Sequence, residues 1–170
     1  MFVTERLTDT GLVTLSYDIA VMAHDGQLYG GHPYIEHPLE VAYLAHGLGY
    51  LEALQAGCLL HDVVEDSDLT LGDLRREGVP RFVVDGVAAV TYDSTVDEMS
   101  KAAKARTHPI GHVIKFCDTS RNFASTVNDP RQHGEAKALA WASNYAEKLG
   151  ELTPGLPSPK EIYDFISMQQ

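Results

Sequence analysis

Residues 57–66 carry the strongest chemical signal in this sequence. They read Gly-Cys-Leu-Leu-His-Asp-Val-Val-Glu-Asp, so that His61, Asp62, Glu65 and Asp66 follow directly after an apolar run. A helix places positions four apart on one face, which predicts that His61 lies under Glu65 and Asp62 under Asp66. Carboxylates gathered beside a His-Asp pair repel one another unless a cation neutralises them or water solvates them. A bound metal ion is the simplest explanation of this cluster.

Two further segments offer metal-binding side chains. His37 stands in Pro-Tyr-Ile-Glu-His-Pro, and Asp118 stands in Lys-Phe-Cys-Asp-Thr-Ser-Arg-Asn. Each lies at a predicted helix end or in a predicted apolar helix, where an inward polar side chain needs a partner. The alternatives without a metal are a helix-capping role for His37, a buried hydrogen-bonded pair at His61-Asp62, and a surface acid at Asp118.

The elements that must position these residues are predicted to be helical. Pro38 suits the first turn of a helix, Thr70 with Asp73 resembles an N-terminal cap, and Ser158 with Glu161 forms a capping box. The valine-rich run 82–90 has strand propensity, but its neighbours favour a helix. Helices are expected over residues 12–22, 39–45, 52–64, 70–78, 82–90, 108–118 and 134–149, and from Ser158 onward.

These expectations define an all-α bundle of about eight or nine helices, with residues 52–64 at its centre because they are apolar on most sides. The length of 170 residues allows a substantial core, and no linker divides the chain. We therefore expect a single domain over residues 1–170.

Charge and hydropathy limit the classes of partner. Asp and Glu outnumber Lys and Arg by 24 to 13, for a net charge of −11. Such a surface repels a nucleic-acid backbone, whereas a metal and a few local cations can still accommodate a small phosphorylated substrate. No apolar stretch approaches the length of a membrane span, and the start lacks a signal-peptide pattern. We expect a cytoplasmic protein in which Cys58 and Cys117, inside apolar segments, are buried reduced thiols.

The order of His37, His61-Asp62 and Asp118 resembles the HD-domain superfamily of metal-dependent phosphohydrolases. Within that superfamily, the chain resembles the hydrolase domain of RelA/SpoT proteins and the metazoan SpoT homologue, which remove the 3′-pyrophosphate of (p)ppGpp. The segments that carry the resemblance are residues 31–38, 59–66, 87–91 and 115–122. The resemblance implies a small hydrolase acting on a nucleotide, with (p)ppGpp as the favoured substrate and GDP or GTP plus pyrophosphate as products.

The resemblance also implies roles for individual residues. The acidic pair Glu65 and Asp66 would orient and deprotonate the attacking water and handle the proton of the leaving oxygen. A divalent metal would lower the pKa of water. Two imidazoles and two carboxylates suit Mn²⁺, and leave Fe²⁺, Co²⁺ and Zn²⁺ open. The implied metal ligands are His37, His61, Asp62 and Asp118.

The implied substrate contacts are less uniform. Asn122 matches a residue that contacts the nucleotide in the family, and Ser125 stands where the family often has a threonine. Lys115 either places positive charge near a phosphate or points to solvent. The chain departs from the family at residues 28–31, where Leu-Tyr-Gly-Gly replaces Arg-Lys-Ser-Gly. A cationic contact is lost there, although Tyr29 can still stack on a base.

This departure leaves other functions open. One alternative keeps the site and changes the substrate to an NTP, a dNTP or NADPH. Another is a domain that binds a nucleotide or a protein partner without turnover, which the presence of all implied ligands and acids disfavours. We further hypothesise that the polar region 92–108, with Lys101, Lys104 and Arg106, approaches the substrate phosphates. The sequence does not tell whether this region forms a lid. Trp141 and Tyr145 are expected to pack in the core.

Overall fold

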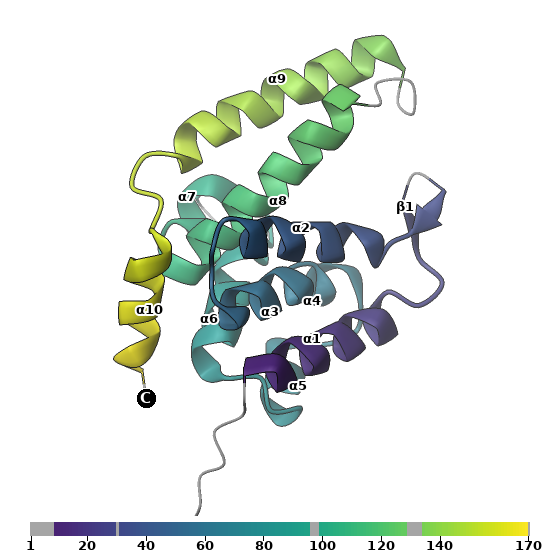
Figure 1. The fold of residues 1–170 in the computed structure, drawn as a ribbon. Coiled ribbons are helices and arrows are strands. Elements are labelled where there is room, and N and C mark those ends of the chain that lie inside the picture. Colours follow the sequence, from purple (N-terminus) through teal and green to yellow (C-terminus); the bar gives the residue numbers. More distant parts are fainter. Residues whose placement is uncertain (1–8, 30, 96–98, 129–133, 170) are drawn as a thin grey trace, which may run out of the picture.

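The computed structural model describes residues 9–29, 31–95, 99–128 and 134–169. Helices dominate these ranges, which confirms the prediction of an all-α bundle (Figure 1). None of the helices in the described ranges combines the length and apolar character needed to cross a bilayer. The elements are α1 (Asp9–Ala23), β1 (Leu28–Tyr29), β2 (His32–Pro33), α2 (Glu36–Gly47), α3 (Glu52–Leu60), α4 (Val63–Asp66), α5 (Leu71–Arg76), α6 (Arg81–Val90), α7 (Lys101–Ala105), α8 (Pro109–Asn128), α9 (Glu135–Leu152) and α10 (Pro159–Ser167).

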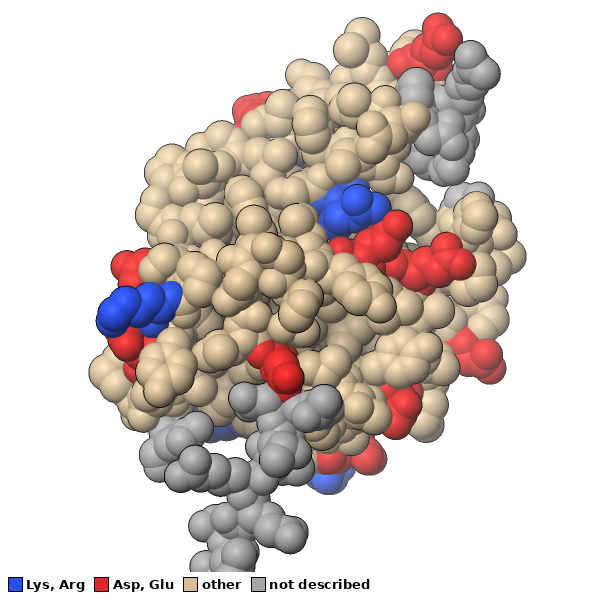
Figure 2. Space-filling model, in the orientation of Figure 1, with Lys and Arg blue, Asp and Glu red and all other residues tan. Residues whose placement is uncertain are grey.

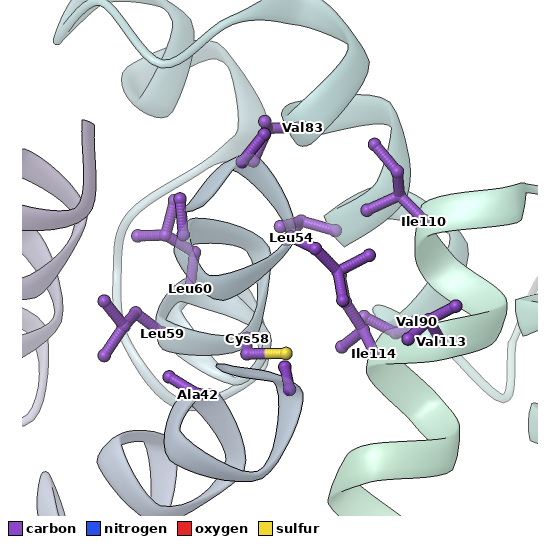
Figure 3. Packing of buried hydrophobic residues seen from close by; sticks show 14 of the residues in the cluster. Ala42, Leu54, Cys58, Leu59, Leu60, Val83, Val90, Ile110, Val113 and Ile114 are labelled. Carbon is purple, nitrogen blue, oxygen red and sulfur yellow. The ribbon is translucent and has the colours of Figure 1, made fainter. Parts of the chain in front are cut away.

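Helix α3 lies at the centre of the core, as its apolar pattern predicts. It contacts α1, α2, α6 and α8. Figure 3 shows its side chains packed beside those of α6 and α8. Fully buried side chains from the three helices include Leu54, Leu60, Val83, Ile110 and Ile114. The metal-binding candidates at the end of α3 are thus attached to the central helix of the core.

Helices α6 and α8 approach each other closely because glycines line their contact. A Cβ added at Gly86 would lie 2.6 Å from Cγ2 of Ile110, and one at Gly111 would lie 2.7 Å from Cβ of Ala89. Glycine inside a helix normally costs stability, so its presence here reflects the need for close packing. The valine-rich run is helical, as preferred, because its valines on one helical face are buried against α3 and α8.

The predicted continuous helix over residues 52–64 is wrong. Helix α3 ends at Leu60, and the one-turn helix α4 starts only at Val63. The Nδ1–H of His61 donates to the carbonyl oxygen of Cys58 (2.7 Å), a side-chain bond that competes with continuation of the helix. The backbone N–H of Asp66 still bonds to the carbonyl of Asp62 (2.9 Å), so these two acids remain one turn apart as predicted.

The helix starts predicted from capping residues are confirmed. Both Thr70 and Ser158 form capping boxes, with Asp73 and Glu161 respectively. Helix α9 runs back alongside α8, and the loop after it leads to α10 (Figure 1). Cys58 and Cys117 are buried and free, in agreement with the expectation of reduced thiols.

The described part of region 92–108 includes a short helix that its polar sequence does not predict. It contains α7, which starts after Ser100 because the Ser100 hydroxyl accepts the N–H of Ala103. Residues 96–98, within the region hypothesised to approach the substrate phosphates, lie outside the described residues. Helix α7 packs against α6, α8 and α9.

Candidate metal centre

The four side chains implied as metal ligands converge from three places. His37 lies in the first turn of α2, His61 and Asp62 lie in the break between α3 and α4, and Asp118 lies within α8. Ligand atoms of His37, His61 and Asp118 all lie within 4.8 Å of one another. Asp62 Oδ2 lies 3.0 Å from Nε2 of His61 and 3.8 Å from Nε2 of His37. Residues separated by up to 81 positions thus form one cluster.

The orientation of His61 is the clearest sign of a metal site. Because its Nδ1–H donates to the Cys58 carbonyl, Nε2 of the neutral ring carries the lone pair. Nε2 is buried and faces oxygens of Asp62 and Asp118, at 3.0 and 3.7 Å. A lone pair aimed at two carboxylates is unfavourable without a positive charge between them. These donors fit a divalent metal ion, which imidazole and carboxylate groups bind readily.

Without a metal, protons must hold this cluster together. Burial lowers the pKa of His61, but Asp62 and Asp118 outweigh burial and raise that pKa well above its usual range. Burial would raise the pKa of Asp118, yet Lys115, His37 and His61 together lower it well below its usual range. The charges of the carboxylates therefore persist, and a metal would replace the proton on His61.

Helical spacing on α8 fixes Asp118 from both sides. Lys115 Nζ donates to Asp118 Oδ2 and Asn122 Nδ2 donates to Asp118 Oδ1, both at 2.6 Å. Burial lowers the pKa of Lys115, but the charge of Asp118 dominates and raises it. Lys115 and Asn122, which the resemblance implies as substrate contacts, therefore also orient the candidate metal ligand Asp118. Both also line the cavity beside the cluster.

The acids Glu65 and Asp66 stand on α4 at the edge of the same cavity. Glu65 accepts the backbone N–H of Tyr92 and lies 3.8 Å from Lys101 Nζ. Asp66 Oδ2 lies 3.1 Å from the hydroxyl of Tyr34, which also donates to Asp62 Oδ2 at 2.7 Å. Burial and these two carboxylates raise the pKa of Tyr34, so its hydroxyl stays protonated and acts as the donor.

Two neighbouring cavities give a substrate access to the cluster. One has a volume of about 260 Å³ and is lined by three of the four candidate ligands, both acids, and the side chains of Lys101 and Lys115. The three ligands are His37, Asp62 and Asp118. The other, of about 220 Å³, includes Ser125 and Arg121, and Arg121 is paired with Glu40 at 2.6 Å. The residues common to both cavities are Tyr29, Tyr34, His37 and Asn122.

Acidic side chains are scattered over the face drawn in Figure 2, and basic ones occur there in few places. One of the basic groups lies where α2 meets α8, next to acidic neighbours. A larger cavity of about 370 Å³ lies between α1, α2 and α3, away from the candidate residues, with mostly apolar walls.

Sequence reasoning misplaced or overlooked several residues. Tyr145, expected in the core, lines the cavity of the cluster. Of the three cations hypothesised to approach phosphates, only Lys101 lines that cavity. Lys104 donates to the Thr91 carbonyl and Arg106 donates to the Glu151 carbonyl.

Tyr34 is not predicted from the sequence as a residue of the site. The signal that could have indicated it is its position in the same motif as His37. The ring of His24 lies against Tyr34, with ring centroids 4.6 Å apart. His24 is buried behind the tyrosine and is absent from the lining of the cavity.

Comparison with known proteins shows the family to which this chain belongs. The profile of the HD domain matches residues 16–113, more than half of the chain. The chain therefore belongs to the HD domain family, in agreement with the resemblance found in its sequence. His37, His61 and Asp62 lie inside the matched region, and Asp118 lies just beyond it.

The chain is also similar to individual proteins of known name. A GTP pyrophosphokinase of Streptomyces coelicolor is 35% identical over 77% of this chain and 16% of its own length. A guanosine-3′,5′-bis(diphosphate) 3′-pyrophosphohydrolase of Haemophilus influenzae is 34% identical over 78% of this chain and 22% of its own. The chain spans about a fifth of the length of these relatives.

A solved structure described as "A metazoan ortholog of SpoT hydrolyzes ppGpp and plays a role in starvation responses" shares the fold. Its TM-score is 0.67 at 22% identity, over 93% of this chain and 94% of that one.

Proposed function

We propose that this chain is a single-domain, metal-dependent phosphohydrolase that removes the 3′-pyrophosphate of (p)ppGpp. Water attacks phosphorus, the bond to the 3′-oxygen breaks, and the products are pyrophosphate and GDP or GTP. The observation that carries the proposal is the convergence of ligand atoms of His37, His61 and Asp118 within 4.8 Å of one another, with the buried Nε2 of His61 also facing Asp62. The names of the similar proteins support (p)ppGpp as the substrate.

We propose His37, His61, Asp62 and Asp118 as the metal ligands and Mn²⁺ as the metal, with Fe²⁺, Co²⁺ and Zn²⁺ as alternatives that the donor set allows. When bound, the ion would act as a Lewis acid and lower the pKa of the attacking water. Lys115 and Asn122 hold Asp118 in the orientation that binding requires.

The proton transfers fall to Glu65 and Asp66. Their side chains line the cavity beside the cluster, where a water molecule and a phosphate can meet. This pair accepts the proton of the attacking water and returns one to the leaving 3′-oxygen, which makes both bond changes possible near neutral pH. Lys101, paired with Glu65, places a positive charge at the same edge of the cavity.

The nucleotide is proposed to lie across the two cavities. Tyr29 is common to both and offers an aromatic face to the base. Ser125 adds a hydroxyl in the second cavity, and Asn122 lies between the two. Lys101 and Lys115 face the phosphates in the first cavity, where their charge offsets that of the substrate.

A second candidate function is hydrolysis of another nucleotide, such as NADPH, an NTP or a dNTP. It is favoured by the hairpin, where Leu28 and Tyr29 form β1 and supply no positive charge. Arg121 in the neighbouring cavity is already paired with Glu40, so few cations there are free to select a guanine nucleotide.

The test is product analysis after incubation of Mn²⁺-loaded protein with ppGpp, pppGpp, NADPH and a panel of NTPs and dNTPs. The control is Asp62→Ala. Pyrophosphate and GDP from ppGpp, absent with the control, would support the proposal. Turnover of another nucleotide alone would favour the second candidate, and binding without any turnover would favour a non-catalytic domain.

A further inference from the structure

Helix α4 carries both proposed acids, yet it has only four residues. A helix of one turn has few internal hydrogen bonds and does not hold its side chains in place by itself. The position of Asp66 must therefore be fixed by contacts with other parts of the molecule. The connection between α1 and α2 provides these contacts.

Tyr34 joins Asp66 to the proposed ligand Asp62. Its hydroxyl donates to Asp62 Oδ2 at 2.7 Å and lies 3.1 Å from Asp66 Oδ2. The same oxygen of Asp62 faces the cluster, 3.0 Å from Nε2 of His61. Two carboxylates so close to one another repel, and the donated hydrogen between them offsets that repulsion. The Tyr34 hydroxyl thus sets the distance between the proposed metal ligand Asp62 and the proposed acid Asp66.

Tyr34 is itself held firmly. Its backbone N–H donates to the carbonyl of Gln27 at 3.0 Å, and its ring lies against that of His24. Gln27 in turn donates through Nε2 to the backbone carbonyl of Asp66 at 2.7 Å, and its Oε1 lies 2.9 Å from Nδ1 of His24. The connection between α1 and α2 therefore holds Asp66 by both its side chain and its backbone.

We infer that Tyr34 is a positioning residue for the hydrolytic step, and that it acts by holding the Asp66 carboxylate beside Asp62. The inference rests on the proposed function, in which Asp66 handles protons. Loss of the hydroxyl leaves Asp66 free to rotate away from the reacting water. Binding of the substrate by the rest of the two cavities is unaffected.

The experiment compares Tyr34→Phe with Tyr43→Phe in the Mn²⁺-loaded protein, with ppGpp as substrate. Tyr43 is a matched control because it lies on α2 with 71% of its surface exposed. Tyr34→Phe is expected to lower kcat about 10- to 100-fold, the usual range for groups that orient a metal site. The values of kcat are compared at saturating Mn²⁺, because Tyr34 also donates to the proposed ligand Asp62. KM should stay within about twofold of the control value, and Tm within about two degrees.

A double-mutant cycle with Asp66→Asn tests the route of the effect. If Tyr34 acts through Asp66, Tyr34→Phe has little further effect in the Asp66→Asn background. A full additional loss of kcat there would overturn the inference, as would a Tyr34→Phe enzyme as active as Tyr43→Phe.

A crystal structure of Tyr34→Phe gives a result independent of turnover. An Asp66 carboxylate turned away from Asp62 supports the inference, and an unmoved one contradicts it. If the Asp66→Asn enzyme is too slow to measure, the crystal structure of Tyr34→Phe alone tests whether Tyr34 positions Asp66. A wild-type protein that releases no pyrophosphate would refute the proposed function instead, and the crystal structure would then decide the positioning role alone.

Discussion

His61 and Cys58 are joined by a hydrogen bond of 2.7 Å, from the imidazole Nδ1–H to the backbone carbonyl oxygen. This bond interrupts the helix that the sequence predicts to continue, and it turns Nε2 toward Asp62 and Asp118. The break in the helix and the orientation of the imidazole are therefore two results of one contact. Such a bond to the second ring nitrogen is typical of histidines that bind metals.

Proton release on metal binding follows from this arrangement. The pKa of His61 in the metal-free protein lies well above its usual value, about 6.5. A raised pKa in the folded state stabilises the protein fully below the unfolded value, and this contribution is lost as pH rises through the folded value. Metal binding requires the neutral ring, so Mn²⁺ must displace a proton at neutral pH.

Calorimetry of Mn²⁺ binding in two buffers of different ionisation enthalpy measures that proton. We expect net release near pH 7 and an affinity that rises with pH. Identical heats in the two buffers would show that His61 is already neutral or does not bind the metal.

The ion pair between Lys115 and Asp118 should matter far more than an equally short pair on the surface. Both its side chains are largely buried, whereas Lys160 and Asp164 form a pair of the same 2.6 Å length with 81% and 51% of their side chains exposed. Lys115→Met leaves a buried carboxylate without its cation, which costs about 3 kcal/mol.

Urea unfolding of the metal-free variants measures this cost, and Lys160→Met should leave the free energy of unfolding nearly unchanged. Equal effects of the two substitutions would contradict the burial of Lys115 at the site.

Lys101 should affect substrate binding, and Arg106 should not. Only Lys101 lines the cavity, while Arg106 is bonded to the Glu151 carbonyl. Lys101→Met removes a positive charge near the substrate phosphates and is expected to raise KM for ppGpp about 10-fold. Steady-state kinetics of both single variants test this, and a larger rise in KM with Arg106→Met would show that region 92–108 is arranged differently when substrate binds.

Gly86 and Gly150 provide a test of helix packing. A Cβ at Gly86 meets Ile110 at 2.6 Å, whereas one at Gly150, in α9, meets nothing within 4 Å. Gly86→Ala is expected to lower the free energy of unfolding by about 1 to 3 kcal/mol through overpacking. Gly150→Ala should raise it by about 0.5 to 1 kcal/mol through helix propensity. If Gly86→Ala stabilises the protein as well, α6 and α8 are not as closely packed as the structure has them.

Much of the fold could be predicted from the sequence because its signals are local. The apolar pattern places α3 in the core, and the caps at Thr70 and Ser158 mark helix starts that the structure confirms. The break at His61 could not be predicted from periodicity, since it depends on a side chain bonding to its own helix. From residues 57–66, His61 and Asp62 come together with His37 and Asp118, and their binding of a metal stays a prediction.

The rest of the site depends on contacts between distant segments. Tyr145 comes to the cavity only because α9 runs back along α8, and amphipathic spacing cannot distinguish that position from the core. In the same way, the role of Lys104 is decided by its bond to the Thr91 carbonyl, which no pattern in residues 92–108 indicates.

The most direct test of the central claim is to follow ppGpp by ³¹P NMR with chelator-treated protein, before and after addition of Mn²⁺, beside Asp118→Asn. We predict no reaction without metal, release of pyrophosphate and GDP when Mn²⁺ is added, and no restoration in the variant. Hydrolysis by the metal-free protein, wild-type rates with Asp118→Asn, or release of orthophosphate in place of pyrophosphate would contradict the account.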